Sequence, residues 1–161
     1  MTEPALVRPA AHADLGATAR LAGKLVRMHH AFDAQRFMLL ENVEAGYERF
    51  FASQLASPDA VILVADRAGT IVGYAYGALE GRNWNNLLEA CGAIHDVFVD
   101  AEARRHGVAG ALVTEMLRRL EALGAPRVVL HTAWANESAQ GLFAALGFRR
   151  TMLEMTRERG A

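Results

Sequence analysis

The sequence has little of three features that would point to particular environments or partners. It contains one cysteine, Cys91, so no disulfide can form within the chain, and its apolar runs stay short of the roughly 18 residues of a membrane span. Lys and Arg total 17 against 18 Asp and Glu, so the chain has no basic field for nucleic acid. The residues from Met1 to Pro4 lack the basic and apolar regions of a signal peptide. We therefore expect a cytoplasmic protein without nucleic-acid or membrane partners.

Apolar residues, in contrast, are plentiful. They make up 52% of the 161 residues, and a chain of this length buries roughly 70% of its unfolded surface on folding. No internal repeat, low-complexity tract or linker rich in Ser, Gly and Pro divides the chain. We expect a single domain over residues 1–161.

Hydrophobic periodicity predicts strands and helices in mixed order. Runs rich in Val, Ile and aromatic residues predict strands at residues 5–8, 60–66, 70–79, 93–99, 128–134 and 148–155. Apolar residues at helical spacing predict helices at residues 15–29, 43–55, 108–123 and 137–146, the last of them closed by Gly147. The sequence therefore indicates a mixed α/β fold.

The junction between the strand at residues 93–99 and the following helix has the composition of a phosphate site. Helix N-termini present unpaired N–H groups and a partial positive charge, and Gly107 allows the backbone to approach a ligand. Arg104 and Arg105 add positive charge. A plain strand–turn–helix junction explains the same residues without any ligand, so the loop alone leaves both interpretations open.

Two motifs resemble the signatures of the GNAT superfamily of acetyl-coenzyme A-dependent N-acetyltransferases. Arg104-x-x-Gly107-x-Ala109 resembles the family's Arg/Gln-x-x-Gly-x-Gly/Ala loop, and it occupies the required position between a strand and a helix. Residues 134–148, with Asn136 and a closing Gly-Phe, resemble the second signature. Residues 7–10 and 71–74 resemble the family's first strand and hairpin. Within the superfamily the chain is loosely similar to the diamine and thialysine acetyltransferase group.

The resemblance implies a fold and a cosubstrate. The fold is a mixed, mostly antiparallel central sheet flanked by helices, with splayed fourth and fifth strands. Acetyl-coenzyme A is the cosubstrate, with its pantetheine arm beside Val97, Phe98 and Val99 and its pyrophosphate on backbone N–H groups of the loop before the long helix. The cosubstrate-binding residues outside that strand are then Arg104, Arg105, His106, Gly107, Val108, Ala109, Asn136 and Phe143.

Acetyl transfer to an amine requires removal of a proton, since an alkyl amine with a pKa near ~10.4 is mostly ammonium at neutral pH. His95 and Asp96 interrupt the apolar strand and are the candidate catalytic residues. We favour His95 as the base, with Asp96 as its orienting partner or substitute. Strand alternation places the two side chains on opposite faces, so both can serve only if the strand bulges. The alternative is a His-Asp pair that only makes structural hydrogen bonds. For the carbonyl oxygen, the backbone N–H of Val97 is the candidate donor.

Phe143 is a departure from the family, whose members commonly carry a Tyr there as the candidate acid for the leaving thiolate.

His29, His30 and Asp33 form no recognisable metal motif, and we predict no metal. Several carboxylates flank the acceptor side in relatives and could favour a cationic amine, although solvated surface carboxylates are the commoner explanation: Asp33, Glu41, Glu44, Glu80 and Glu89.

Three functions remain open at this point. The leading hypothesis is acetyl transfer to a primary amine of a small molecule by direct attack in a ternary complex. The second changes the acceptor to a protein N-terminus or lysine, and the third is a catalytically weak sensor that binds coenzyme A. A homodimer is also expected, because the last strands of relatives often pair across subunits and residues 148–155 would end near an unpaired edge.

Overall fold

The strands and helices follow the predicted order as far as the last predicted strand. The structure, a computed structural model, describes residues 3–161, so Met1 and Thr2 of the segment inspected for a signal peptide lie outside it. The strands are β1 Leu6–Pro9, β2 Ala60–Arg67, β3 Thr70–Glu80, β4 Cys91–Val99 and β5 Val128–Leu130. The helices are α1 Leu15–Phe32, α2 Val43–Leu55, α3 Val108–Ala122 and α4 Glu137–Ala145, with short 3-10 turns η1 His12–Asp14 and η2 Ala101–Ala103.

The five strands form one mixed sheet in the order β1-β2-β3-β4-β5. The first four are antiparallel neighbours, whereas β4 and β5 run parallel. β4 pairs with β5 only through Gly92, Ala93 and Ile94, so β5 leaves the edge of β4 unpaired from His95 to Val99. The predicted fold class, a mostly antiparallel sheet with splayed fourth and fifth strands and flanking helices, is confirmed.

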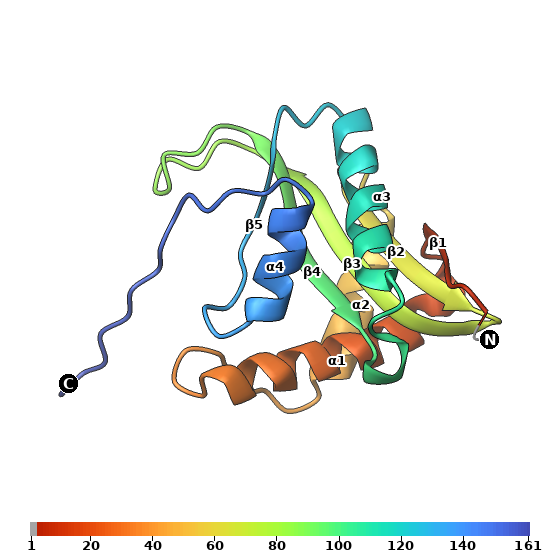
Figure 1. Cartoon of the computed structure of the whole chain (residues 1–161), viewed down its shortest axis with the longest axis horizontal. Helices are drawn as coiled ribbons and strands as arrows, with labels where there is room; N and C mark the ends of the chain where they lie inside the picture. The colour runs from red at the N-terminus through yellow and green to blue at the C-terminus, as the bar shows by residue number, and fades with distance from the viewer. Residues whose placement is uncertain (1–2) are drawn as a thin grey trace.

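Helices cover both faces of the sheet (Figure 1). The alternation of β3 explains the division, because Tyr74 and Tyr76 pack toward α1 and α2 while Ala75 packs toward α3. One core therefore joins Leu21 and Phe51 to these tyrosines. The other is built on the buried stripe of α3, with α4 packed against it: Val108, Leu112, Val113, Met116 and Leu120.

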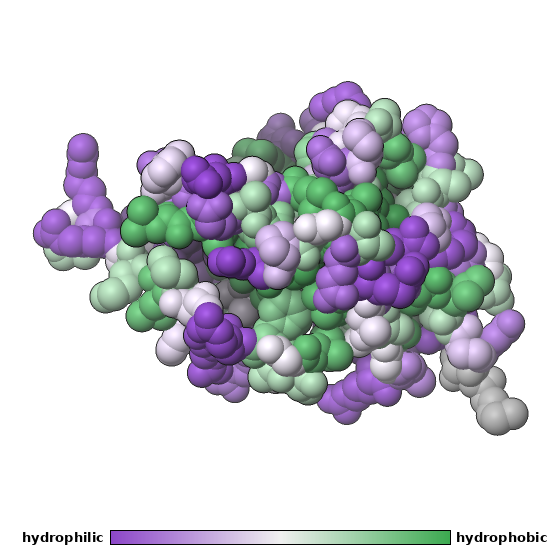
Figure 2. All heavy atoms as spheres, turned by 90° about the horizontal axis from the view of Figure 1, so that it is seen from above, coloured by the Kyte–Doolittle hydropathy of each residue, from purple (hydrophilic) through white to green (hydrophobic). Residues whose placement is uncertain are grey.

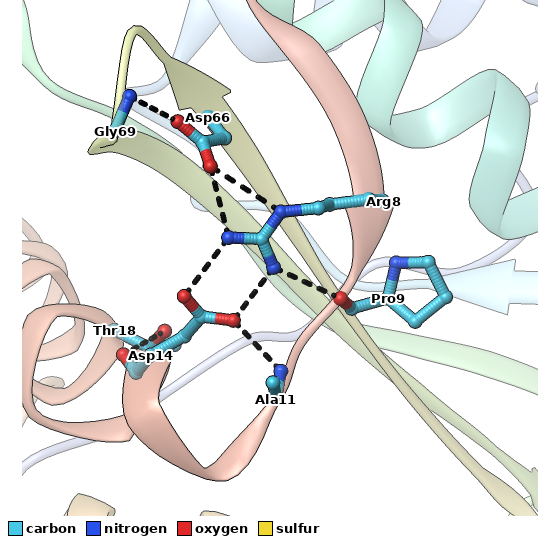
Figure 3. A network of polar contacts seen from close by, with 7 residues as sticks. All are labelled: Arg8, Pro9, Ala11, Asp14, Thr18, Asp66 and Gly69. Carbon is cyan, nitrogen blue, oxygen red and sulfur yellow. Dashed lines mark hydrogen bonds and ion pairs between the residues drawn. The ribbon is translucent and has the colours of Figure 1, made fainter.

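Arg8 links the buried carboxylate of Asp14 to Asp66, which accepts the Gly69 N–H in the turn between β2 and β3 (Figure 3). Arg8 of β1 donates to both oxygens of Asp14, at 2.7 and 3.0 Å, and to Asp66 of β2 at 2.9 Å. Asp14 also accepts the Ala11 N–H at 2.7 Å. Hydrogen bonds from Arg8 are the main cause of the lowered pKa of Asp14.

We expect Asp14→Asn to lower the free energy of unfolding by about 1–3 kcal/mol near pH 7, because the amide leaves Arg8 with only one of its two charged partners, Asp66. A carboxyl with a lowered folded-state pKa stabilises the fold above its unfolded pKa and loses that contribution as pH falls through the folded value. Urea titrations from pH 7 down to pH 3 should therefore show the wild type approaching the variant. Asp59→Asn is the control, since Asp59 is exposed, and a deficit for Asp14→Asn that stayed constant with pH would contradict the assignment.

The predicted last strand is wrong. Residues 148–155 form no strand, and the strand predicted at residues 128–134 is confined to Val128–Leu130. Gly147, at φ +92°, ends α4, and the following chain runs away from the sheet in both views, with an ion pair between Glu154 and Arg36 as a contact with the rest of the molecule (Figure 1 and Figure 2). Met152, Leu153 and Met155 are 77%, 63% and 86% exposed. Apolar alternation gives strand propensity, but a strand also needs a neighbouring backbone, and this segment has none within the described chain.

Candidate active site

A β-bulge in β4 brings the two predicted catalytic side chains to the same face of the sheet. Tyr76 of β3 is paired with Asp96, but the next residue, Gly77, is paired with Ile94, so His95 is the extra residue. Asp96 and His95 then share a pocket, while Ile94 packs in the α3 core. The bulge predicted as the condition for His95 and Asp96 to act together is therefore present.

Gly77 allows β3 and β4 to approach closely beside this bulge. A Cβ at Gly77 would lie 2.8 Å from the carbonyl oxygen of Ala93 and 2.9 Å from the sulfur of Met116. A side chain there would push the strand or α3 away, so the local geometry of the bulge depends on glycine at this position.

The pocket that contains His95 and Asp96 has a volume of about 390 Å³ and lies between the sheet and α2. Tyr47 and Phe50 of α2 contribute aromatic rings to it. The His95 ring stacks on Tyr76, with ring centroids 5.4 Å apart and planes 25° apart. Its lining combines aromatic and acidic groups and includes no Lys or Arg: Tyr47, Phe50, Tyr76, Glu80, His95 and Asp96.

Each of the two carboxylates in the pocket has its own partner. Glu80 Oε1 lies 2.5 Å from Nε2 of His95, and the Tyr74 hydroxyl donates to Asp96 at 3.0 Å. Burial raises the pKa of Asp96. Burial also raises the pKa of Tyr47 to about 12, and that of Tyr74 is raised well above its ordinary value, so both phenols keep their protons at neutral pH. His95 and Asp96 are therefore the candidate bases.

The loop before α3 forms an open cradle with unpaired N–H groups. Arg105 and Gly107 have φ values of +64° and +74°, and Gly107 caps the helix without a side-chain hydrogen bond. No atom lies within 4 Å of a Cβ built on Gly107. The first N–H groups of α3 have no hydrogen-bond acceptor among residues 3–161, which suits an anion such as a pyrophosphate.

Side-chain contacts hold this loop in place. Arg104 Nε donates to the carbonyl oxygen of Val99 at 2.9 Å, and its guanidinium lies 5.5 Å from the centre of the Phe98 ring. Lys24 of α1 pairs with Asp100 at 2.8 Å. Arg104 thus shapes the loop through its side chain.

The remaining predicted residues of the loop and strand lie where a cosubstrate could reach their backbone. Arg105 and His106 are exposed, whereas Val108 is buried and Ala109 half-buried at the start of α3. Val97 and Val99 pack toward α3 and Phe98 toward α1 and α2. The backbone edge of β4 that β5 leaves unpaired is open to hydrogen bonds with a ligand, except at the Val99 carbonyl oxygen, which already accepts from Arg104.

Asn136 and Phe143 have structural contacts of their own. The Asn136 side chain caps α4 by accepting the Ala139 N–H at 3.2 Å. The Phe143 ring packs edge-on against Phe148, with centroids 5.8 Å apart, and touches the α3 core. Contacts of either residue with coenzyme A stay predictions.

The sequence profile of the acetyltransferase (GNAT) family matches residues 25–148, which include the bulge, the loop and α4. The chain belongs to the GNAT family. The predicted family is confirmed, and acetyl-coenzyme A is the cosubstrate of GNAT N-acetyltransferases. The cradle at Gly107 and the open edge of β4 fit a ligand with a pyrophosphate and a long amide-bearing arm.

Several known proteins share part of the sequence or the whole fold with this chain. A mycothiol acetyltransferase from Thermobispora bispora is 32% identical over 92 residues, which are 57% of this chain and 31% of that protein. The chain thus spans about a third of the length of this curated relative. The BH1408 protein of Bacillus halodurans, solved as a mutant, superposes with a TM-score of 0.81 at 18% identity and covers 95% of this chain and 98% of that one. The aminoglycoside N-acetyltransferase AAC(6')-Iy, solved with CoA, has a TM-score of 0.79 at 17% identity, with coverage of 98% and 95%.

Within residues 3–161, no group of three or more His, Cys, Asp or Glu side chains could hold a metal ion. No helix in the same range is long and apolar enough to cross a membrane. The absence of a metal from the reaction stays a prediction.

Proposed function

We propose that this GNAT chain transfers the acetyl group of acetyl-coenzyme A to a primary amine of a small molecule, by direct attack in a ternary complex. The bulge in β4 carries the proposal, because it places His95 and Asp96 together beside the unpaired strand edge. Bases in a pocket next to an open edge are what acetyl transfer to an amine needs.

The pocket supports a small cationic acceptor. Its volume of about 390 Å³ is within the usual range for small-molecule sites. Carboxylates and aromatic faces both attract an ammonium group, and the lining has no Lys or Arg to hold an anionic acceptor.

The proposed reaction moves one proton before the bond exchange. The lone pair of His95 takes a proton from the acceptor ammonium, and the free amine forms a C–N bond to the acetyl carbon. The Val97 N–H is the proposed donor to the carbonyl oxygen. The C–S bond breaks with its electron pair on sulfur. The nitrogen, cationic after the attack, gives up its second proton to water, and the thiolate takes a proton from water because Phe143 carries no hydroxyl group. The products are an N-acetylated amine and coenzyme A.

Release of free thiol from acetyl-coenzyme A tests this function. The purified chain is assayed against a panel of alkyl amines, amino sugars, lysine peptides and whole proteins. Turnover with small cationic amines supports the proposal, whereas turnover only with peptides or proteins would assign a protein acetyltransferase. Binding of acetyl-coenzyme A without turnover on any member of the panel would assign a sensor.

We also propose that the protein acts in the cytoplasm, because it has a single cysteine. Cys91 is buried at the start of β4, and burial raises its pKa. A buried, protonated thiol that cannot pair within the chain suits a reducing compartment.

The C-terminal segment supports a homodimer. β5 is an edge strand with one neighbour, and the extended residues 148–155 expose three large apolar side chains, Met152, Leu153 and Met155. A second copy would cover both the open edge and these side chains. The strand at residues 148–155 from which the sequence predicted a dimer is absent, so the proposal rests on the exposed side chains and the edge of β5.

We expect sedimentation at micromolar concentration to give twice the mass of the chain, and Leu153→Asp to shift the protein toward the monomer. Leu6→Asp is the matched control, because Leu6 is 66% exposed on the opposite edge strand β1. A monomeric wild type at this concentration would refute the dimer.

A further inference from the structure

The contact between Glu80 and His95 joins residues of two strands at the mouth of the acceptor pocket. Glu80 is the last residue of β3, and His95 is the extra residue of the β4 bulge. Their side chains meet through one ring nitrogen, Nε2, at 2.5 Å. The ring is held from its face as well, by stacking on Tyr76.

We propose that Glu80 is a positioning residue for His95: its carboxylate accepts a hydrogen bond from Nε2–H and so leaves Nδ1 as the basic nitrogen for the acceptor amine. This inference rests on the proposed function. It adds a role for Glu80 and names Nδ1 as the atom of His95 that takes the proton.

The tautomer follows from the chemistry of the contact. An ionised carboxylate can only accept hydrogen bonds, so the ring nitrogen facing Glu80 carries a proton. A neutral imidazole has one N–H, and its other nitrogen then holds the lone pair. Within residues 3–161 no protein group forms a hydrogen bond to Nδ1 of His95, which leaves it for the acceptor.

The Glu80–His95 pair is partly exposed, which limits its contribution to the stability of the fold. The side chains of His95 and Glu80 are 40% and 45% exposed, and ion pairs this open contribute little to the stability of a fold. Loss of Glu80 should therefore leave the fold intact. What it removes is the orientation of the ring and the tautomer, on which proton transfer depends.

The test combines Glu80→Gln, His95→Ala and the double variant, with Glu80→Asp as the conservative replacement. We expect Glu80→Gln to lower kcat about 3- to 30-fold and to leave KM for acetyl-coenzyme A unchanged. In the His95→Ala background the same change should have no further effect, and Glu80→Asp should recover part of the rate. Glu115→Gln is the control, since Glu115 pairs with Arg118 and Arg119 on α3 away from the pocket.

¹⁵N NMR of the His95 ring gives a readout that does not depend on turnover. The wild type should show the Nε2–H tautomer, and Glu80→Gln should show a mixture. A ring with the proton on Nδ1 in the wild type would overturn the proposal. So would an equal loss of kcat from Glu80→Gln with and without His95, because Glu80 would then act on the acceptor directly. A wild type with the Nε2–H tautomer but no turnover would instead contradict the proposed function.

Discussion

Replacing His95 by alanine should lower kcat roughly 10- to 1,000-fold while leaving the affinity for acetyl-coenzyme A nearly unchanged. The His95 ring lies in the pocket between the sheet and α2, stacked on Tyr76, whereas the cradle at Gly107 lies at the start of α3. The substitution therefore removes the base without touching the loop proposed to hold the pyrophosphate. Steady-state kinetics with an amine found in the panel and calorimetry with acetyl-coenzyme A measure the two effects.

Two further variants test whether the loss of kcat is specific to His95. Asp96→Asn should have a smaller effect on kcat, because the Tyr74 hydroxyl still has an acceptor at that position. His12→Ala removes an exposed imidazole on η1 and should leave the kinetics unchanged. An acidic limb of the pH–rate profile that persisted unaltered in His95→Ala would assign the base to another group, with Asp96 and its raised pKa as the first candidate.

Gly107→Glu should abolish binding of acetyl-coenzyme A. Gly107 has a φ of +74° and open space where a Cβ would stand, at the uncapped N-terminus of α3. A glutamate side chain would fill this space and repel the pyrophosphate. Calorimetry should show loss of binding, and acetyl-coenzyme A should no longer raise the melting temperature as it does for a protein that binds it.

Gly124→Glu controls for backbone strain and added charge. Gly124 follows the C-terminus of the same helix, has a φ of +98°, and also has no atom within 4 Å of a Cβ. Both variants place glutamate in a left-handed conformation, so both lose stability. Only the variant at Gly107 should lose the ligand, and unchanged affinity in that variant would show that the cosubstrate binds elsewhere.

Local signals predicted most of the fold. The helix predicted at residues 43–55 is α2 Val43–Leu55, and the strand predicted at residues 93–99 is β4 Cys91–Val99. These elements are specified by hydrophobic periods within a few residues, and turn and cap residues such as Gly107 and Gly147 mark their ends. The strand predicted at residues 148–155 is absent because a strand needs a neighbouring backbone to pair with. The apolar pattern of a segment does not show whether the fold will provide that neighbour.

The candidate site was likewise predicted in part from the sequence and decided in part by the tertiary structure. The sequence alone pointed to the family through Arg104, Gly107 and Ala109, and to His95 and Asp96 through the polar break in an apolar strand, because these signals lie between neighbours in the chain. Tertiary structure decided whether the two catalytic candidates could act together. The register of β3 against β4 creates the bulge at His95, and it brings Glu80, fifteen residues earlier, to Nε2 of the ring. Register is a relation between two strands, so no pattern read along one of them contains it.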